Sequence, residues 1–98
     1  MGRALNVAAA LNAYILSDRG SWLNYQNDTD LKIVCSDDPA FFNQYTFIAV
    51  NPAQHAHIDF KAVGKLQNWL LSDAAQQVIN GFRINKEQLF FYNAQRVQ

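Results

Sequence analysis

The side chains best suited to bind a ligand lie in one short polar segment of this 98-residue chain, residues 17–21 (SDRGS). The guanidinium of Arg19 offers a planar fork of donors that fits an oxyanion, and the hydroxyls of Ser17 and Ser21 offer neutral donors beside it. The segment follows a short apolar run that predicts a strand, and strand ends of open α/β sheets are where ligands bind. Residues 17–21 are therefore a candidate anion site.

A purely structural role would account for the same residues. Asp18 is a residue type that caps helices, and Arg19 can pair with a neighbouring carboxylate. In that interpretation both side chains only hold a short helix that begins near Gly20. The spacing leaves the two interpretations open.

The start of a predicted helix over residues 3–14 is a second place where an anion could bind. Ala4, Val7, Ala8 and Leu11 recur there at helical spacing, and Tyr14 and Ile15 continue the same face. No Ser, Thr, Asp or Asn precedes the helix to cap it. Solvent, a preceding segment or an anion must therefore satisfy the first free N–H groups.

Other chemical motifs are scarce. The sequence has no Gly-rich phosphate loop, paired-cysteine zinc pattern, Gly-x-Ser-x-Gly elbow or His-Glu-x-x-His pair, so we expect neither an enzyme nor a bound cofactor. His55 and His57, with Asp59, make only a weak metal pattern that is more typical of a solvated loop. Cys35 is the single cysteine, and its apolar surroundings predict an inert core thiol.

Composition favours one small, well-packed domain. Half of the residues are apolar, and eight basic residues balance eight acidic ones. A neutral chain offers no electrostatic case for nucleic acid or an anionic membrane. No run approaches the ~20 apolar residues of a membrane helix, and no signal peptide is visible.

The order of predicted elements indicates an α/β fold, a mixed sheet with flanking helices. Apolar patterning predicts strands at residues 31–36 and 45–50. Asp38, Asp59 and Ser72 are expected helix N-caps, and Val63, Leu66 and Leu70 are expected on a buried helix face. Gly81 is placed to end the last helix in a left-handed turn. The aromatic stretch 82–92 is too apolar for a free tail.

Several blocks of the sequence resemble the C-terminal portion of tungstate-type ABC-transporter substrate-binding proteins, in that family's order and spacing. These blocks are residues 13–23 (AYILSDRGSWL), Asp38-Pro39 with residues 42–45 (FNQY), residues 50–55 (VNPAQH), and residues 88–91 (QLFF) with Asn93-Ala94. The resemblance covers nearly the whole chain.

The resemblance implies part of a type II periplasmic binding protein, which closes two α/β lobes on tungstate or molybdate and delivers it to an ABC permease in the inner membrane. Residues 1–44 would belong to one lobe, and residues 45–98 to a crossover strand and the other lobe. The family's Thr/Ser-rich N-terminal segment and its Ser-Arg-Gly-Asp stretch do not occur here, so we expect N-terminal lobe segments to be missing. The full-length protein would be periplasmic.

Together, residue chemistry and resemblance make Gly2, Ser17, Asp18 and Arg19 the expected ligand-binding residues, with no catalytic or metal-binding residues. Gly2 matches the last Gly of a family Gly-Met-Gly segment at a helix start. The alternative is a stand-alone protein-interaction module that binds no ligand. Exposed aromatic residues also predict self-association of this chain.

Overall fold

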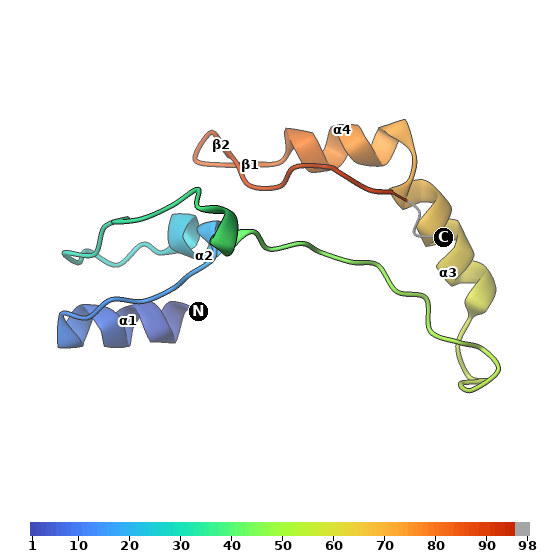
Figure 1. The fold of residues 1–98 in the computed structure, drawn as a ribbon, viewed down its shortest axis with the longest axis horizontal. Coiled ribbons are helices and arrows are strands. Elements are labelled where there is room, and N and C mark those ends of the chain that lie inside the picture. The colour runs from blue at the N-terminus through green and yellow to red at the C-terminus, as the bar shows by residue number, and fades with distance from the viewer. Residues whose placement is uncertain (96–98) are drawn as a thin grey trace. The chain divides into compact units, whose positions relative to one another are not determined.

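The structure is a computed structural model that describes residues 1–95, and over these residues it is a small mixed α/β structure with one two-stranded sheet (Figure 1). Its helices are α1 (Gly2–Leu11), α2 (Arg19–Asn24), a 3-10 turn η1 (Pro39–Phe41), α3 (Phe60–Leu70) and α4 (Asp73–Gly81). Its strands are β1 (Arg83–Ile84) and β2 (Glu87–Gln88), which pair antiparallel. No described helix is long and apolar enough to cross a membrane.

The chain divides into two compact units. The first unit contains Met1–Phe42 and Arg83–Leu89, and therefore α1, α2, η1 and the β1–β2 hairpin. The second contains Asn43–Phe82 and the described residues from Phe90 onward, with α3 and α4.

Helix α1 begins at Gly2 without a side-chain cap, as the sequence predicts, but it ends three residues earlier than expected. Asn12 ends it in the left-handed conformation (φ 52°, ψ 48°), a backbone state that asparagine tolerates better than most residues. The backbone N–H of Ala13 then donates to the carbonyl of Ala8 at 2.9 Å. This cap turns the chain back, so Tyr14 and Ile15 lie beyond the helix.

Three predicted N-caps are confirmed. Asp38 accepts a hydrogen bond from the N–H of Ala40 at 2.8 Å, and Asp59 accepts one from Ala62 at 3.0 Å. The hydroxyl of Ser72 accepts from the N–H of Ala75 at 3.3 Å. Short polar side chains thus satisfy N–H groups that a helix start leaves free.

The predicted role of Gly81 is wrong. Gly81 is the last residue of α4, and the residue after it, Phe82, has an extended backbone (φ −68°, ψ 129°). The chain passes directly from the helix toward β1, so no left-handed residue is needed at this end.

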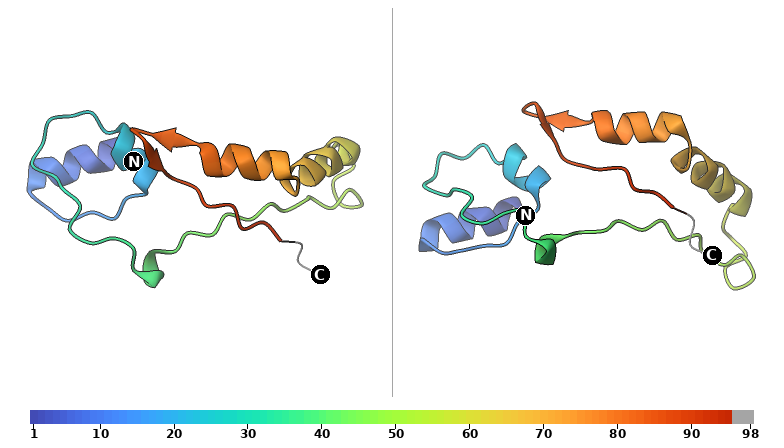
Figure 2. Two further views of the ribbon diagram at one scale, coloured as in Figure 1. Left: turned by 90° about the horizontal axis from the view of Figure 1, so that it is seen from above. Right: turned by 45° about the horizontal axis from the view of Figure 1, so that its top comes forward.

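The predicted strands at residues 13–16, 31–36 and 45–50 are not formed among the described residues. These segments are extended but unpaired, and Figure 2 shows the long green stretch before α3 as a bare chain. A strand is stable only when a neighbour shares its backbone hydrogen bonds, and no described segment does so here. Cys35 is accordingly exposed, so the prediction of a core thiol is wrong.

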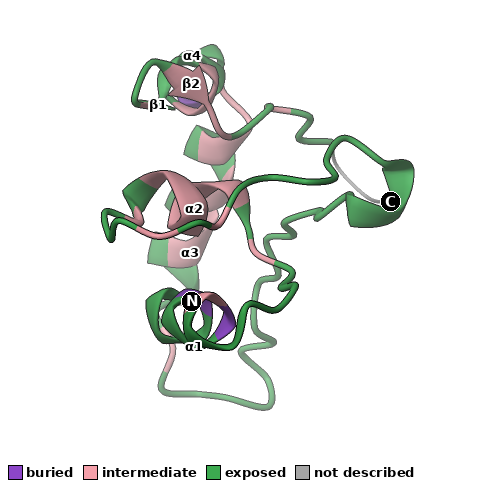
Figure 3. Ribbon diagram, turned by 90° about the vertical axis from the view of Figure 1, so that its left-hand side faces the viewer, coloured by how far each residue is buried: buried purple, intermediate pink, exposed green. Residues whose placement is uncertain are grey.

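The core is small. Among the described hydrophobic residues only Leu5, Ala8 and Ala75 are buried (Figure 3, purple). The predicted buried face of α3 is only partly covered, because Val63 and Leu70 are half-buried and Leu66 is 49% exposed. Apolar side chains therefore form much of the surface of each unit.

In the second unit Tyr92 is held against the helices, which agrees with the prediction that the aromatic stretch is not a free tail. The hydroxyl of Tyr92 donates to the carbonyl of Leu70 at 2.6 Å, and the backbone N–H of Tyr92 donates to the Asn80 side chain at 2.8 Å. The rings of Tyr45 and Phe90 pack edge to face with centroids 5.8 Å apart.

Candidate functional site

The candidate anion segment forms the start of α2. Asp18 is its N-cap, and its Oδ2 atom accepts a hydrogen bond of 2.9 Å from the backbone N–H of Ser21. The hydroxyl of Ser17 donates to the carbonyl of Asp18 at 3.0 Å. The backbone hydrogen bond from Ser21, followed by one from the Ser21 side chain, lowers the pKa of the Asp18 carboxyl. Asp18 is therefore charged at neutral pH, and its carboxylate is engaged as the N-cap of α2.

Arg19 is the first residue of α2, and it pairs with a carboxylate from another part of the chain. Its Nη1 atom lies 3.5 Å from Oε1 of Glu87. The side chains of Arg19 and Glu87 are 32% and 43% exposed, respectively. The Arg19 guanidinium is thus accessible from solvent, while one of its nitrogens is paired with the Glu87 carboxylate of the same chain.

A β-hairpin brings Glu87 to this position. Ile84 lies opposite Glu87, and the two turn residues, Asn85 and Lys86, both have positive φ (51° and 67°), which is typical of a type I′ turn. The Asn85 side chain donates to the carbonyl of Leu23 in α2 at 3.3 Å. Turn geometry and this hydrogen bond together hold the hairpin on α2.

Gly20 leaves little free space between the cap and the hairpin. A Cβ atom at this position would lie 3.4 Å from Oδ2 of Asp18 and 3.6 Å from a methyl carbon of Leu89. These are ordinary van der Waals distances. The side chain of Leu89, the residue after the hairpin, therefore lies close to the backbone of Gly20.

Sequence reasoning missed the hairpin and with it Glu87. The Asn85-Lys86 pair lacks the glycine that makes an Asn-Gly hairpin turn easy to recognise, and each strand is only two residues long. The available signal was Asn85 itself, because asparagine tolerates positive φ.

The structure brings Ser17, Asp18 and Arg19 together in one turn, whereas Gly2 lies at the start of α1. Gly2 is exposed, and a Cβ atom added there would meet nothing within 4 Å. The N-terminus of α1 is thus open on the side that a side chain at residue 2 would occupy. Whether Gly2 contributes to a site with the other three stays a prediction.

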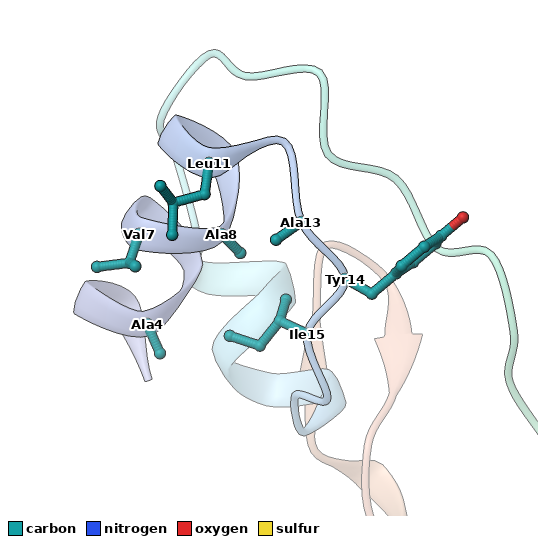
Figure 4. A pocket seen from close by; sticks show the side chains of 7 residues that line it. All are labelled: Ala4, Val7, Ala8, Leu11, Ala13, Tyr14 and Ile15. Atoms are coloured by element: carbon teal, nitrogen blue, oxygen red, sulfur yellow. The ribbon is translucent and has the colours of Figure 1, made fainter.

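A separate groove of about 390 Å³ lies between α1 and the chain that turns back along it (Figure 4). Apart from the Tyr14 hydroxyl, its lining side chains are apolar; they are Ala4, Val7, Ala8, Leu11, Ala13, Tyr14 and Ile15. Such a lining cannot replace the hydration of a dianion, so we do not assign the oxyanion to it.

The weak metal pattern gains no support from the geometry. The rings of His55 and His57 lie edge to face with centroids 6.1 Å apart, and Asp59 is engaged as the cap of α3. Within residues 1–95, no group of three or more His, Cys, Asp or Glu side chains is arranged to hold a metal ion.

Comparison with known proteins identifies relatives over most of the chain. The tungstate-binding protein TupA of Peptoclostridium acidaminophilum is 35% identical over 82 residues, which is 84% of this chain and 29% of that protein. A putative ABC transporter anion-binding protein of Haloferax volcanii is 35% identical over 99 aligned positions, 96% of this chain and 29% of that protein. The tungstate-binding protein TupA of Campylobacter jejuni is 27% identical over 95 positions, 93% of this chain and 35% of that protein.

Neither profiles of known protein families nor solved structures match the chain. The class that the relatives define is nonetheless consistent, since all three are named as binding proteins for tungstate or another anion. The predicted resemblance to tungstate-type substrate-binding proteins is therefore confirmed. The chain spans about a third of the length of these relatives.

Proposed function

We propose that this chain forms part of the substrate-binding component of an ABC transporter for a tetrahedral oxyanion, tungstate or molybdate. The observation that carries this proposal is the 35% identity to a tungstate-binding protein across 84% of the chain. The relatives are named as binding proteins, so we propose no catalysed reaction. In this account the full-length protein is periplasmic and delivers the anion to a permease in the inner membrane.

The proposed architecture is a type II periplasmic binding protein, with this chain as its C-terminal portion. Residues 1–44 would contribute to one lobe, and residues 45–98 to a crossover strand and the other lobe. The chain covers 29% to 35% of its relatives, which supports treating it as one part of such a protein.

The proposed ligand-binding residues are Gly2, Ser17, Asp18 and Arg19. Arg19 would supply the charge, since its partly exposed guanidinium can donate two parallel hydrogen bonds to an oxyanion. Ser17 would offer a hydroxyl donor, and Gly2 would offer free backbone N–H groups at the start of α1. Asp18 would act by holding the turn through its hydrogen bond to Ser21.

Neutral donors suit this ligand class. A dianion that leaves water must recover its hydrogen bonds from the protein, and N–H and O–H groups do this without needing equal counter-charge. The near-zero net charge of the chain is therefore compatible with oxyanion binding.

The experiment is a calorimetric titration of the full-length polypeptide that contains these residues, with tungstate, molybdate and sulfate in separate runs. We expect tungstate or molybdate to bind at least about 100-fold more tightly than sulfate, a difference of ~2.7 kcal/mol. Equal, weak heats for all three anions would refute the oxyanion proposal and favour the interaction-module alternative.

A further inference from the structure

The pairing of Arg19 with Glu87 bears on how the proposed anion site would be filled. Oε1 of Glu87 lies 3.5 Å from Nη1 of Arg19, an ion-pair contact that brings the carboxylate to a nitrogen that an oxyanion would also approach. A carboxylate is itself an oxyanion and presents its oxygens to the guanidinium fork in the same way. Glu87 therefore occupies part of the surface that the ligand would use.

We propose that Glu87 is an affinity-determining residue that competes with the oxyanion for Arg19. This inference rests on the proposed function, because it requires Arg19 to contact the ligand. In this account tungstate binds by exchanging places with the Glu87 carboxylate on Arg19, and the affinity observed is the net result of that exchange.

The hairpin keeps the competitor close to Arg19. Glu87 is fixed in register opposite Ile84, and the turn is tied to α2 by the hydrogen bond from Asn85 to the Leu23 carbonyl. A carboxylate held by backbone structure has a high effective concentration at its partner, so it competes more strongly than a free anion would.

The exposure of the pair makes the exchange feasible. The Glu87 side chain is 43% exposed, so its carboxylate can turn toward water when it leaves Arg19. Ion pairs with this exposure are weak and are screened by salt, so an anion that makes additional hydrogen bonds can displace the carboxylate at a cost of only a few-fold in affinity. Asp18, the other carboxylate at this turn, is retained by the backbone N–H of Ser21 and does not need to move.

The exchange would act on affinity rather than on selectivity. Every anion that contacts Arg19 must displace the same carboxylate, so Glu87 would raise the Kd of each of these anions by the same factor. Discrimination between anions would then depend on the hydrogen bonds that each anion makes with Arg19 and the neighbouring donors.

The test compares tungstate affinities of Glu87→Gln, Glu87→Asp and the unmodified full-length protein by calorimetry. Asp28→Asn is the matched control, because it removes one negative charge from an exposed carboxylate in the same unit. We expect Glu87→Gln to bind tungstate about three- to tenfold more tightly, with a smaller gain for the shorter Glu87→Asp and a change below about 1.5-fold for Asp28→Asn. Glu87→Asp retains the charge and serves if Glu87→Gln does not fold.

The outcomes separate this inference from the function on which it rests. Unchanged or weaker tungstate binding by the Glu87 variants would overturn the competition. Weaker binding would show instead that Glu87 is a positioning residue for Arg19. An equal gain in Asp28→Asn would also overturn it, because the effect would then come from net charge. Absence of tungstate binding by the unmodified protein would instead refute the proposed function. It would also refute the competition, which requires tungstate to bind at Arg19.

Discussion

The Asp18 carboxylate and the Ser21 backbone N–H are joined by a 2.9 Å hydrogen bond that defines the start of α2. Arg19, the residue on which the functional proposal depends, lies between them as the first residue of the helix that this hydrogen bond caps. Stability of the helix start and geometry of the candidate site are thus linked through one carboxylate.

Replacing Asp18 should destabilise this helix start. Asp18→Ala removes the acceptor for the Ser21 N–H, and loss of an N-cap typically costs ~1 kcal/mol of folding free energy. Asp18→Asn retains a good capping side chain and is the matched control. Chemical denaturation followed by circular dichroism should show a lower midpoint for Asp18→Ala alone, and equal midpoints for the two variants would argue against the cap.

The cap should also respond to acid. Hydrogen bonds from Ser21 lower the pKa of Asp18 below that of the unfolded chain. The folded state then binds fewer protons than the unfolded state, so the contribution of Asp18 is complete above the unfolded-state pKa of ~3.9 and is lost as pH falls through the lower folded-state value. Unfolding free energies measured from pH 6 to pH 2 should fall less steeply for Asp18→Asn than for the unmodified chain.

Local signals in the sequence predicted the helix starts and failed for pairing between segments. Asp38, Asp59 and Ser72 cap as expected because a cap involves only neighbouring residues. The segments at 31–36 and 45–50 carry strand-like patterns, but a strand depends on a partner that the pattern does not specify. Glu87 was missed for the same reason, since its contact with Arg19 joins residues far apart in the chain.

The unpaired segment around Cys35 gives a direct chemical prediction. Because the thiol is exposed, the native 98-residue chain should react with a thiol reagent such as dithionitrobenzoate at a rate within about tenfold of the denatured chain. A reaction more than 100-fold slower in the native chain would show that Cys35 is covered.

Exposed aromatic side chains predict self-association of the 98-residue chain. Phe91 is 73% exposed, Phe42 is 72% exposed, and the extended segments present unpaired backbone groups. Sedimentation velocity across a concentration series should reveal dimers or larger species, and Phe91→Ser should shift the distribution toward monomer. A monomer at all concentrations would contradict the prediction.

Arg19 is the residue on which the functional account depends most. If its guanidinium contacts the oxyanion, Arg19→Ala should weaken tungstate binding by ~2 to 4 kcal/mol, and Arg19→Lys should recover only part of this because the bidentate fork is lost. A purely structural role predicts lower stability with an affinity that changes by less than about threefold, or ~0.7 kcal/mol.

The most direct measurement is the shift in melting temperature that tungstate causes in the full-length protein and in its Arg19→Ala and Arg19→Lys variants. A ligand that binds only the folded state raises the free energy of unfolding in proportion to the logarithm of its concentration over its Kd, so the shift reports affinity even where stability differs. The account predicts a large shift for the unmodified protein, a reduced shift for Arg19→Lys and little or none for Arg19→Ala. A full tungstate-induced shift in both variants would show that Arg19 is not a ligand residue and would contradict the proposed site.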